Sequence, residues 1–240
     1  MLREACKADL DDIVRIHIAG FTQEPMDNYC YPFRWEYPDD HFKWLKKEYE
    51  FYLSHPEKYV IHVAEPEDGD QLGKPMAFSV WDVSVMTQLP EFGESTNDLP
   101  PYTCPSKLTR FSFIVLSDQG LDERRDAIKS HVQAYNEAIE KRCKPGGYFY
   151  KWGHHQLTLH VLTVLPGFRR RGIGTMLVDW GIQEAKRKKE QGWAVTIIAS
   201  PMGELLYTHL GFKRIATEVV QVDGEEDFFT SGVMVMETQE

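Results

Sequence analysis

The sixteen residues from His160 to Thr175, HVLTVLPGFRRRGIGT, constrain the fold of this chain most strongly. The residues that lead into them are apolar and partly β-branched, which predicts a buried strand that ends near Val164. Pro166 and Gly167 break that strand. Beyond Gly174, apolar side chains recur at helical spacing, so a helix follows the loop. The apolar positions of this predicted helix are Ile173, Met176, Leu177 and Trp180.

The loop between the predicted strand and helix has the properties of an anion site. At the start of a helix the backbone N–H groups lack partners, and the positive end of the helix dipole favours negative charge. Gly172 and Gly174 carry no Cβ, so a phosphate can approach the backbone closely. The sequence therefore predicts that this loop binds a phosphate group.

Two common phosphate loops do not fit these residues. A Walker A loop has Lys followed by Ser or Thr after its last glycine, and here Thr175 follows Gly174 without that Lys. The dinucleotide fingerprint has a third glycine three residues further on, where this chain has Leu177. The remaining pattern is Arg169-x-x-Gly172-x-Gly174, and alone it could also be a basic turn that caps an ordinary helix.

This pattern, behind a strand that ends in Val164-x-Pro166, resembles the pyrophosphate loop of the GCN5-related N-acetyltransferases, the GNAT superfamily. The resemblance continues downstream. Residues 194–199 form a second short β-rich run, and a short helix with Tyr207 and Gly211-Phe212 resembles the family's "Y…GF" signature. A strand over 212–222 would follow. The clear resemblance covers residues 156–222.

The resemblance implies an α/β (α+β) fold with a mixed, largely antiparallel central sheet flanked by helices. It also implies an insertion between the third and fourth strands, at about residues 84–150. A length of 240 residues suits a single domain over residues 1–240. Proline and glycine are frequent in residues 84–120, which predicts a long loop that is a lid, a binding loop or a disordered segment. This loop is expected to border the acceptor site.

The remaining elements are predicted from residue pattern alone. Residues 21–38 look irregular, and their aromatic side chains either line an acceptor pocket or form a satellite core. The expected elements are a first strand over 1–5, helices over 10–20, 39–54, 121–143 and 173–190, and a hairpin of 59–65 with 75–83. The aromatic residues concerned are Phe21, Tyr29, Tyr31, Phe33, Trp35 and Tyr37.

Composition excludes several classes of function. No apolar run approaches the roughly 20 residues of a membrane span, and the N-terminal residues show no secretion signal, which predicts a cytoplasmic protein. The four cysteines have no metal-ligand spacing, so no metal is expected.

Net charge is −10, yet seven of the 27 Lys and Arg lie within residues 169–189. This balance suits a small polyanion better than a nucleic acid. The run at 186–189 is interpreted as a helix end rather than a nuclear localisation signal.

The resemblance assigns a cofactor site for acetyl-CoA. The pyrophosphate would lie on the N–H groups of residues 170–175, with arginine charge nearby. The pantetheine arm would pair like an extra strand with the fourth strand. A backbone N–H near Val164 would stabilise the charge that develops on the thioester oxygen. The cofactor-binding residues implied are Leu162, Thr163, Val164, Arg169, Arg170, Arg171, Gly172, Ile173, Gly174 and Thr175.

Two catalytic residues follow from the same resemblance. Tyr207 matches the family's tyrosine, which protonates the leaving thiolate, although it could also be an ordinary packing residue. His160 lies where the arylalkylamine N-acetyltransferases have a proton-relaying histidine, but the histidine two residues earlier is replaced by Thr158. A water molecule could replace His160 as base, and His154 and His155 are weaker candidates.

The resemblance implies an acetyl-CoA-dependent N-acetyltransferase that acts on the primary amine of a small molecule by direct attack in a ternary complex. Other interpretations are a non-catalytic acyl-CoA-binding module and an acetyltransferase for a protein or peptide amine. The partners expected are acetyl-CoA and an amine, without nucleic acid or membrane. The protein is expected to be a monomer or a homodimer. The acidic composition favours cationic acceptors.

Overall fold

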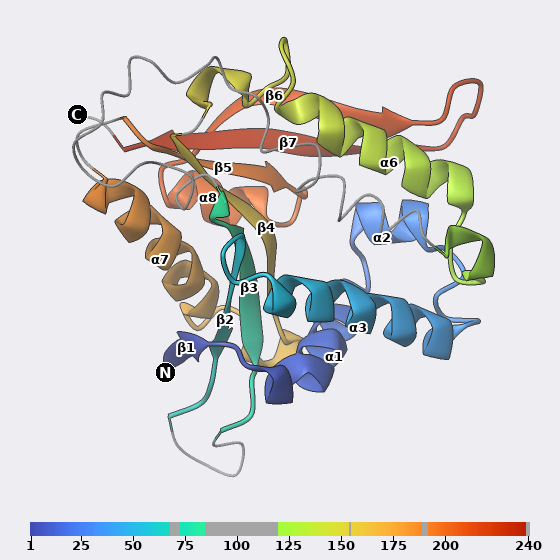
Figure 1. Ribbon diagram of the computed structural model, residues 1–240, viewed down its shortest axis with the longest axis horizontal. Coiled ribbons are helices and arrows are strands. Elements are labelled where there is room, and N and C mark those ends of the chain that lie inside the picture. Colours follow the sequence, from blue (N-terminus) through green and yellow to red (C-terminus); the bar gives the residue numbers. More distant parts are fainter. Residues whose placement is uncertain (68–72, 85–119, 154, 189–191, 239–240) are drawn as a thin grey trace.

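The structure is a computed structural model of the 240-residue chain, and it describes residues 1–67, 73–84, 120–153, 155–188 and 192–238. Most of the segment predicted to be a long loop or lid, residues 85–119, lies outside these ranges, as do His154 and most of the predicted hairpin turn. Figure 1 shows one twisted sheet with helices on both of its faces. The mixed α/β architecture predicted from sequence is confirmed.

Within these described ranges, seven strands form the sheet in the order β1-β2-β3-β4-β5-β7-β6. Among these strands β4 and β5 run parallel, and the other neighbouring pairs are antiparallel. The sheet is therefore largely antiparallel, as predicted. The strands are β1 (Leu2–Glu4), β2 (Tyr59–Ala64), β3 (Ala77–Asp82), β4 (Gln156–Val164), β5 (Ala194–Ala199), β6 (Lys213–Gln221) and β7 (Phe228–Glu237).

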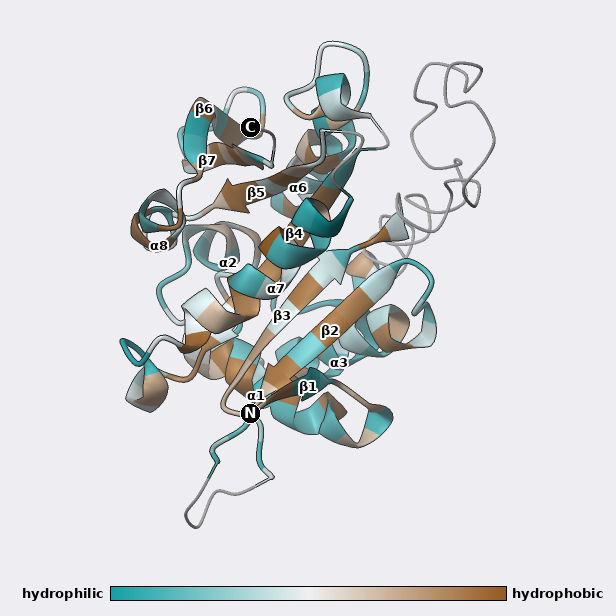
Figure 2. Cartoon of the chain, turned by 90° about the vertical axis from the view of Figure 1, so that its left-hand side faces the viewer, coloured by the Kyte–Doolittle hydropathy of each residue, from teal (hydrophilic) through white to brown (hydrophobic). Residues whose placement is uncertain are grey.

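Two N-terminal helices cover one face of the first strands. They are α1 (Leu10–Gly20) and α3 (Pro38–Ser54), close to the bounds predicted from apolar spacing. Side chains alternate across β3, so Phe78 and Val80 pack with Ile13 and Tyr49 in one apolar cluster. Figure 2 shows a hydrophobic stretch along β2, whose Tyr59, Ile61 and Val63 belong to the same cluster.

The helix α7 (Ile173–Arg187) covers the opposite face of β3 (Figure 1). There Trp81, the β3 residue next to Val80, packs with Val178 and Ile182 of α7. This helix is the one predicted after the basic loop. It ends at Arg187, followed by the C-cap Lys188, and its last turn carries Lys186 and Arg187, as the helix dipole favours.

The structure corrects three predictions. The segment predicted to be irregular contains α2 (Pro25–Cys30), which is too short to show a periodic pattern and starts with proline at its first turn. The helix predicted from residue 121 begins only at Lys129, as α6 (Lys129–Arg142). The last strand, β7, was not predicted, and it occupies the sheet between β5 and β6.

An ionic cluster explains the late start of α6. Asp126 is fully buried and accepts hydrogen bonds from Arg124 at 2.6 and 2.9 Å, while the ring of His41 lies 2.9 Å away. These tertiary contacts fix residues 124–126 outside a helix, although their composition allows one. Burial alone would raise the pKa of Asp126, but hydrogen bonds from His41 and Arg124 lower it to about 2.

Candidate active site

The strands β4 and β5 separate in the middle of the sheet. Their pairing covers only Gln156–Leu159 of β4, whereas the pairing of β4 with β3 continues to Val164. The last residues of β4 therefore have no strand beside them on the β5 side, within the described part of the chain. The backbone of Leu162, Thr163 and Val164 borders this opening, so an extended ligand chain has room to add to the sheet edge there.

A β-bulge marks the point where the strands separate. Val80 pairs with Val161 and Trp81 with Leu159, so His160 is the extra residue of β4. The Nε2 atom of His160 lies 3.6 Å from Oδ2 of Asp82, the last residue of β3. Burial alone would raise the pKa of Asp82, but hydrogen bonds from His160 and Ser84 hold it below its usual value.

The loop after β4 has the backbone geometry of an anion site. Arg170 and Gly172 both have positive φ, of 63° and 80°, and α7 begins immediately afterwards. The N–H of Met176 donates to the carbonyl of Gly172 at 3.0 Å, and this is the first bond of the helix. The N–H groups of residues 173–175 precede it and point out of the first turn. Arg170 and Arg171 are exposed beside them.

Arg169 has a different position from the other two arginines. Its Nε donates to the carbonyl of Val164 at 3.1 Å, and its Nη2 donates to the carbonyl of Gly20 at 2.7 Å. The guanidinium therefore joins the end of β4 to the end of α1. This geometry favours a positioning role for Arg169.

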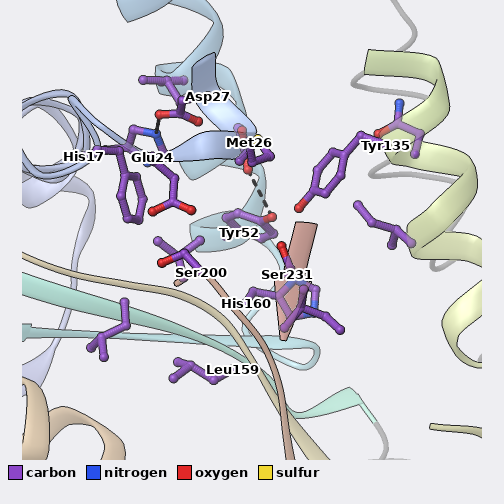
Figure 3. A pocket seen from close by; sticks show the side chains of 18 of the residues that line it. His17, Glu24, Met26, Asp27, Tyr52, Tyr135, Leu159, His160, Ser200 and Ser231 are labelled. Carbon is purple, nitrogen blue, oxygen red and sulfur yellow. Dashed lines mark hydrogen bonds and ion pairs between the residues drawn. The ribbon is translucent and has the colours of Figure 1, made fainter. Parts of the chain in front are cut away.

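A cavity of about 460 Å³ begins at the opening between β4 and β5. Residues of β4, β5 and α8 (Glu204–His209) line one end of it, and residues of α1, α2, α3 and α6 line the other. Figure 3 shows that side chains from these distant segments converge on one space. We call the first end the cofactor end, lined by Leu159–Leu162, Ile197, Ile198, Ser200 and Tyr207, and the second the acceptor end.

Of the aromatic residues predicted for an acceptor pocket, Phe21 and Tyr31 line the cavity. Tyr29 packs in an apolar cluster with Val132 and Phe229, whereas Phe33 and Trp35 are exposed. Most of the aromatic wall comes instead from segments far apart in sequence. These residues are Trp44, Tyr52, Tyr59, Tyr135, Phe149 and Phe229.

Tyr207 lies in the wall of the cofactor end. It belongs to α8, and its side chain is 7% exposed. Burial, and to a smaller extent the charge of Glu24, raises the pKa of its phenol well above the usual value. The phenol is therefore protonated at neutral pH and can donate a proton or a hydrogen bond.

Glu24 is the residue that sequence analysis missed. It is the N-cap of α2, immediately before Pro25, and its carboxylate lines the cavity close to the hydroxyl of Ser200. Burial, assisted by the negative charge of Asp27, raises the pKa of Glu24 to about 7. A glutamate with such a pKa exchanges protons near neutral pH. In the sequence, Glu24 lies in a segment that was predicted to be irregular, and no local pattern marks it as a chemical group.

A buried network of polar side chains lies close to Glu24. Asp27, one turn along α2, is 1% exposed, and its Oδ2 lies 3.4 Å from Nε2 of His17. The other ring nitrogen of His17 lies 2.6 Å from the hydroxyl of Tyr49. Figure 3 shows His17, Glu24 and Asp27 gathered on one side of the cavity.

Two negative observations concern only the described part of the chain. None of its helices is long and apolar enough to cross a membrane. The same residues include no group of three or more His, Cys, Asp and Glu side chains that could hold a metal ion.

Comparison with known proteins agrees with this geometry. The family model of the Acetyltransferase (GNAT) domain matches residues 107–227. An acetyltransferase from Stachybotrys chartarum is 24% identical over 243 residues, covering 100% of this chain and 91% of the relative.

Two solved structures share the fold. Arylalkylamine N-acetyltransferase 2 from Aedes aegypti has a TM-score of 0.57 at 12% identity, covering 100% of this chain and 99% of its own. A Corynebacterium glutamicum structure described as histone acetyltransferase HPA2 and related acetyltransferase has a TM-score of 0.52 at 16% identity, covering 98% and 94%. With the family match over half of the sequence, the chain belongs to the GNAT family and is an acyltransferase.

Proposed function

We propose that this enzyme transfers the acetyl group of acetyl-CoA to the primary amine of a small molecule, by direct attack in a ternary complex. One observation carries the proposal: a carboxylate whose pKa is about 7, on Glu24, and a protonated phenol, on Tyr207, border the same cavity where β4 and β5 separate. These are the base and the acid that acetyl transfer to an amine requires.

The cofactor would lie along β4 and the loop that follows. The N–H groups of residues 170–175 would bind the pyrophosphate, assisted by Arg170 and Arg171. The backbone of Leu162, Thr163 and Val164 would pair with the pantetheine arm. Thr175 and Ile173 would contribute their N–H groups at the start of α7. A backbone N–H near Val164 would face the thioester oxygen.

Glu24 would act as the general base. An amine that enters as an ammonium ion gives one proton to the carboxylate of Glu24, which leaves a nitrogen lone pair. That nitrogen attacks the thioester carbonyl, so a C–N bond forms. The hydrogen bond between Glu24 and Ser200 would orient the carboxylate towards the cofactor end.

Tyr207 would act at the collapse of the intermediate. The C–S bond breaks, the phenol of Tyr207 protonates the leaving thiolate, and the second proton of the nitrogen restores the phenol. The proton on Glu24 returns to solvent. The products are the N-acetylated amine, CoA as free thiol and one proton, so the reaction balances.

His160 lines the cofactor end of the cavity, and its Nε2 lies 3.6 Å from Oδ2 of Asp82. It was predicted from sequence as the catalytic base. We assign the base to Glu24, because its carboxylate is hydrogen-bonded to Ser200 and its charge raises the pKa of Tyr207. His160 is retained as a second proton acceptor of the cavity, whose contribution a substitution would measure.

The test is turnover of acetyl-CoA with a panel of amines, read by release of free thiol and by mass of the acetylated product. The panel contains aliphatic amines, arylalkylamines, amino acids and peptides with free N-termini. We expect small primary amines to be acetylated faster than peptides. Acetylation of peptides alone would contradict the small-molecule assignment, and thiol release without any acetylated amine would contradict the transfer reaction.

A further inference from the structure

The Lys and Arg side chains that line the cavity already have partners other than the carboxylates of its acceptor end. Among the residues that the structure describes, Arg124 is paired with Asp126 and Arg142 with Glu218, each through two hydrogen bonds. The ammonium of Lys47 lies 3.9 Å above the ring of Trp44. The cations that line the cavity are therefore largely occupied.

Three carboxylates that line the same cavity have no Lys or Arg ion pair within the described ranges. They are Glu24 and Asp27 of the α2 segment and Glu48 of α3. Asp82, also in the wall, faces His160, and Glu123 is exposed. Glu48 is half-buried and accepts one hydrogen bond, from the hydroxyl of Tyr52 at 3.2 Å. Burial raises the pKa of Glu48, although the hydrogen bond from Tyr52 and the charge of Arg124 oppose that rise.

Asp27 provides an independent indication of a ligand. Its side chain is almost completely buried and lines the cavity, and its Oδ1 atom has no hydrogen-bond partner in the described structure. A buried carboxylate oxygen without a donor is costly, because its hydration is lost and nothing replaces it. A bound ligand with an N–H donor would satisfy it. Its Oδ2, by contrast, already faces His17.

Resting on the function proposed above, we propose that the acceptor is a short aliphatic diamine: one nitrogen is acetylated beside Glu24, and the second, as an ammonium ion, binds between Asp27 and Glu48. An ammonium ion has three donors, which suits the free oxygen of Asp27 and the carboxylate of Glu48 together. An aromatic wall beside such a site adds cation–π attraction, and Tyr52 lines the cavity next to Glu48.

The spacing of the carboxylates sets the length of the diamine. Glu24 and Asp27 are three residues apart at the start of one helix, which separates their Cβ atoms by roughly 5–6 Å. Two nitrogen atoms joined by about three to five methylene groups span a similar distance when the chain is extended. Longer polyamines would have to place their remaining nitrogens outside this pair of sites.

The experiment compares propane-1,3-diamine, butane-1,4-diamine and pentane-1,5-diamine with the monoamines of equal chain length. For the wild-type enzyme we expect kcat/KM to be higher for the best diamine by about 10-fold or more, the usual effect of a hydrogen bond to a charged group. A diamine has two equivalent nitrogens, so an advantage of about twofold or less is statistical and would overturn the proposal.

Two variants of α3 distinguish the effect of a carboxylate in the subsite from the effect of losing one negative charge elsewhere on the helix. Glu48→Gln keeps the size of the side chain and an acceptor for Tyr52, so we expect the diamine advantage to fall to about twofold. Glu50→Gln makes the same change at an exposed position of that helix, where the ion pair to Lys7 is long, and should preserve the advantage. An unchanged advantage in Glu48→Gln would overturn the assignment of Glu48.

A binding measurement keeps the proposal testable even without turnover. Titration of butane-1,4-diamine and of butan-1-amine into the protein saturated with CoA should give tighter binding of the diamine, lost in Glu48→Gln. Equal affinities would overturn the subsite. Tight diamine binding without acetylation would instead overturn the proposed function and leave the subsite standing. Rapid acetylation of monoamines with no preference for diamines would overturn the subsite and leave the proposed function standing.

Discussion

The two ends of the cavity are built in different ways. The cofactor end comes mainly from one continuous stretch, in which β4, the loop after it and α7 follow each other from Gln156 to Arg187. The acceptor end combines α1, α2 and α3 of the N-terminal part with α6, which begins only at Lys129. A continuous stretch can be predicted from its own pattern, whereas a convergent wall depends on tertiary packing. The proposed chemistry combines Tyr207 of the first end with Glu24 of the second.

The largest effect is expected from Glu24→Gln, because this change removes the proposed base and keeps the shape of the side chain. We expect kcat to fall by about 10²- to 10⁴-fold, the usual range for general-base catalysis. The KM for acetyl-CoA should remain close to that of the wild type, since Glu24 belongs to the acceptor end. The matched control is Glu36→Gln, an exposed position of the same segment. Near wild-type kcat in Glu24→Gln would show that the acceptor end supplies no base at this position.

Tyr207→Phe tests the chemical contribution of the cofactor end. The change removes the proton donor and keeps the ring that packs on Phe212. We expect kcat to fall by roughly 10- to 1,000-fold, with little change in the KM for acetyl-CoA or in the melting temperature. A normal kcat with a lowered melting temperature, in conditions where chemistry limits the rate, would reduce Tyr207 to a packing residue.

Gly174→Val tests the cofactor end through binding rather than chemistry. A Cβ at this position would lie 3.2 Å from Cδ2 of Leu206, and a valine would add bulk where the pyrophosphate is expected. We expect the KM for acetyl-CoA to rise by roughly 10- to 100-fold, as expected from the loss of charge-assisted hydrogen bonds. Gly167→Val is the control, because a Cβ at residue 167 meets no atom within 4 Å. An unchanged KM in a folded Gly174→Val protein would remove the loop from the cofactor site.

His160→Gln is expected to have the smallest effect. His160 lies where the two ends meet, paired with Asp82 on the bulge of β4. If Glu24 is the base, kcat should fall by less than about 10-fold, below the range of general-base catalysis. A fall as large as that of Glu24→Gln would return the role of base to His160, as the sequence resemblance suggested.

The difference between the two ends also explains how far sequence analysis reached. The strand before the loop, the start of α7 and the position of Tyr207 on a short helix were all predicted, because each depends on neighbouring residues. Glu24 was not predicted, because its pKa depends on burial against Ser200 and Asp27, contacts that no local pattern encodes. The late start of α6 was missed for the same reason, since Asp126 is held by His41 from another helix. β7 enters the sheet between two earlier strands, and only long-range pairing shows that position.

The pH dependence of kcat/KM for a monoamine acceptor tests the central claim most directly. Because burial raises the pKa of Glu24 to about 7, its carboxylate is protonated and inactive in acid, and kcat/KM should rise through pH 7 to a plateau. This limb should disappear in Glu24→Gln and persist in His160→Gln. A limb that persists in Glu24→Gln, or that disappears only in His160→Gln, would contradict the account in which Glu24 accepts the proton of the amine.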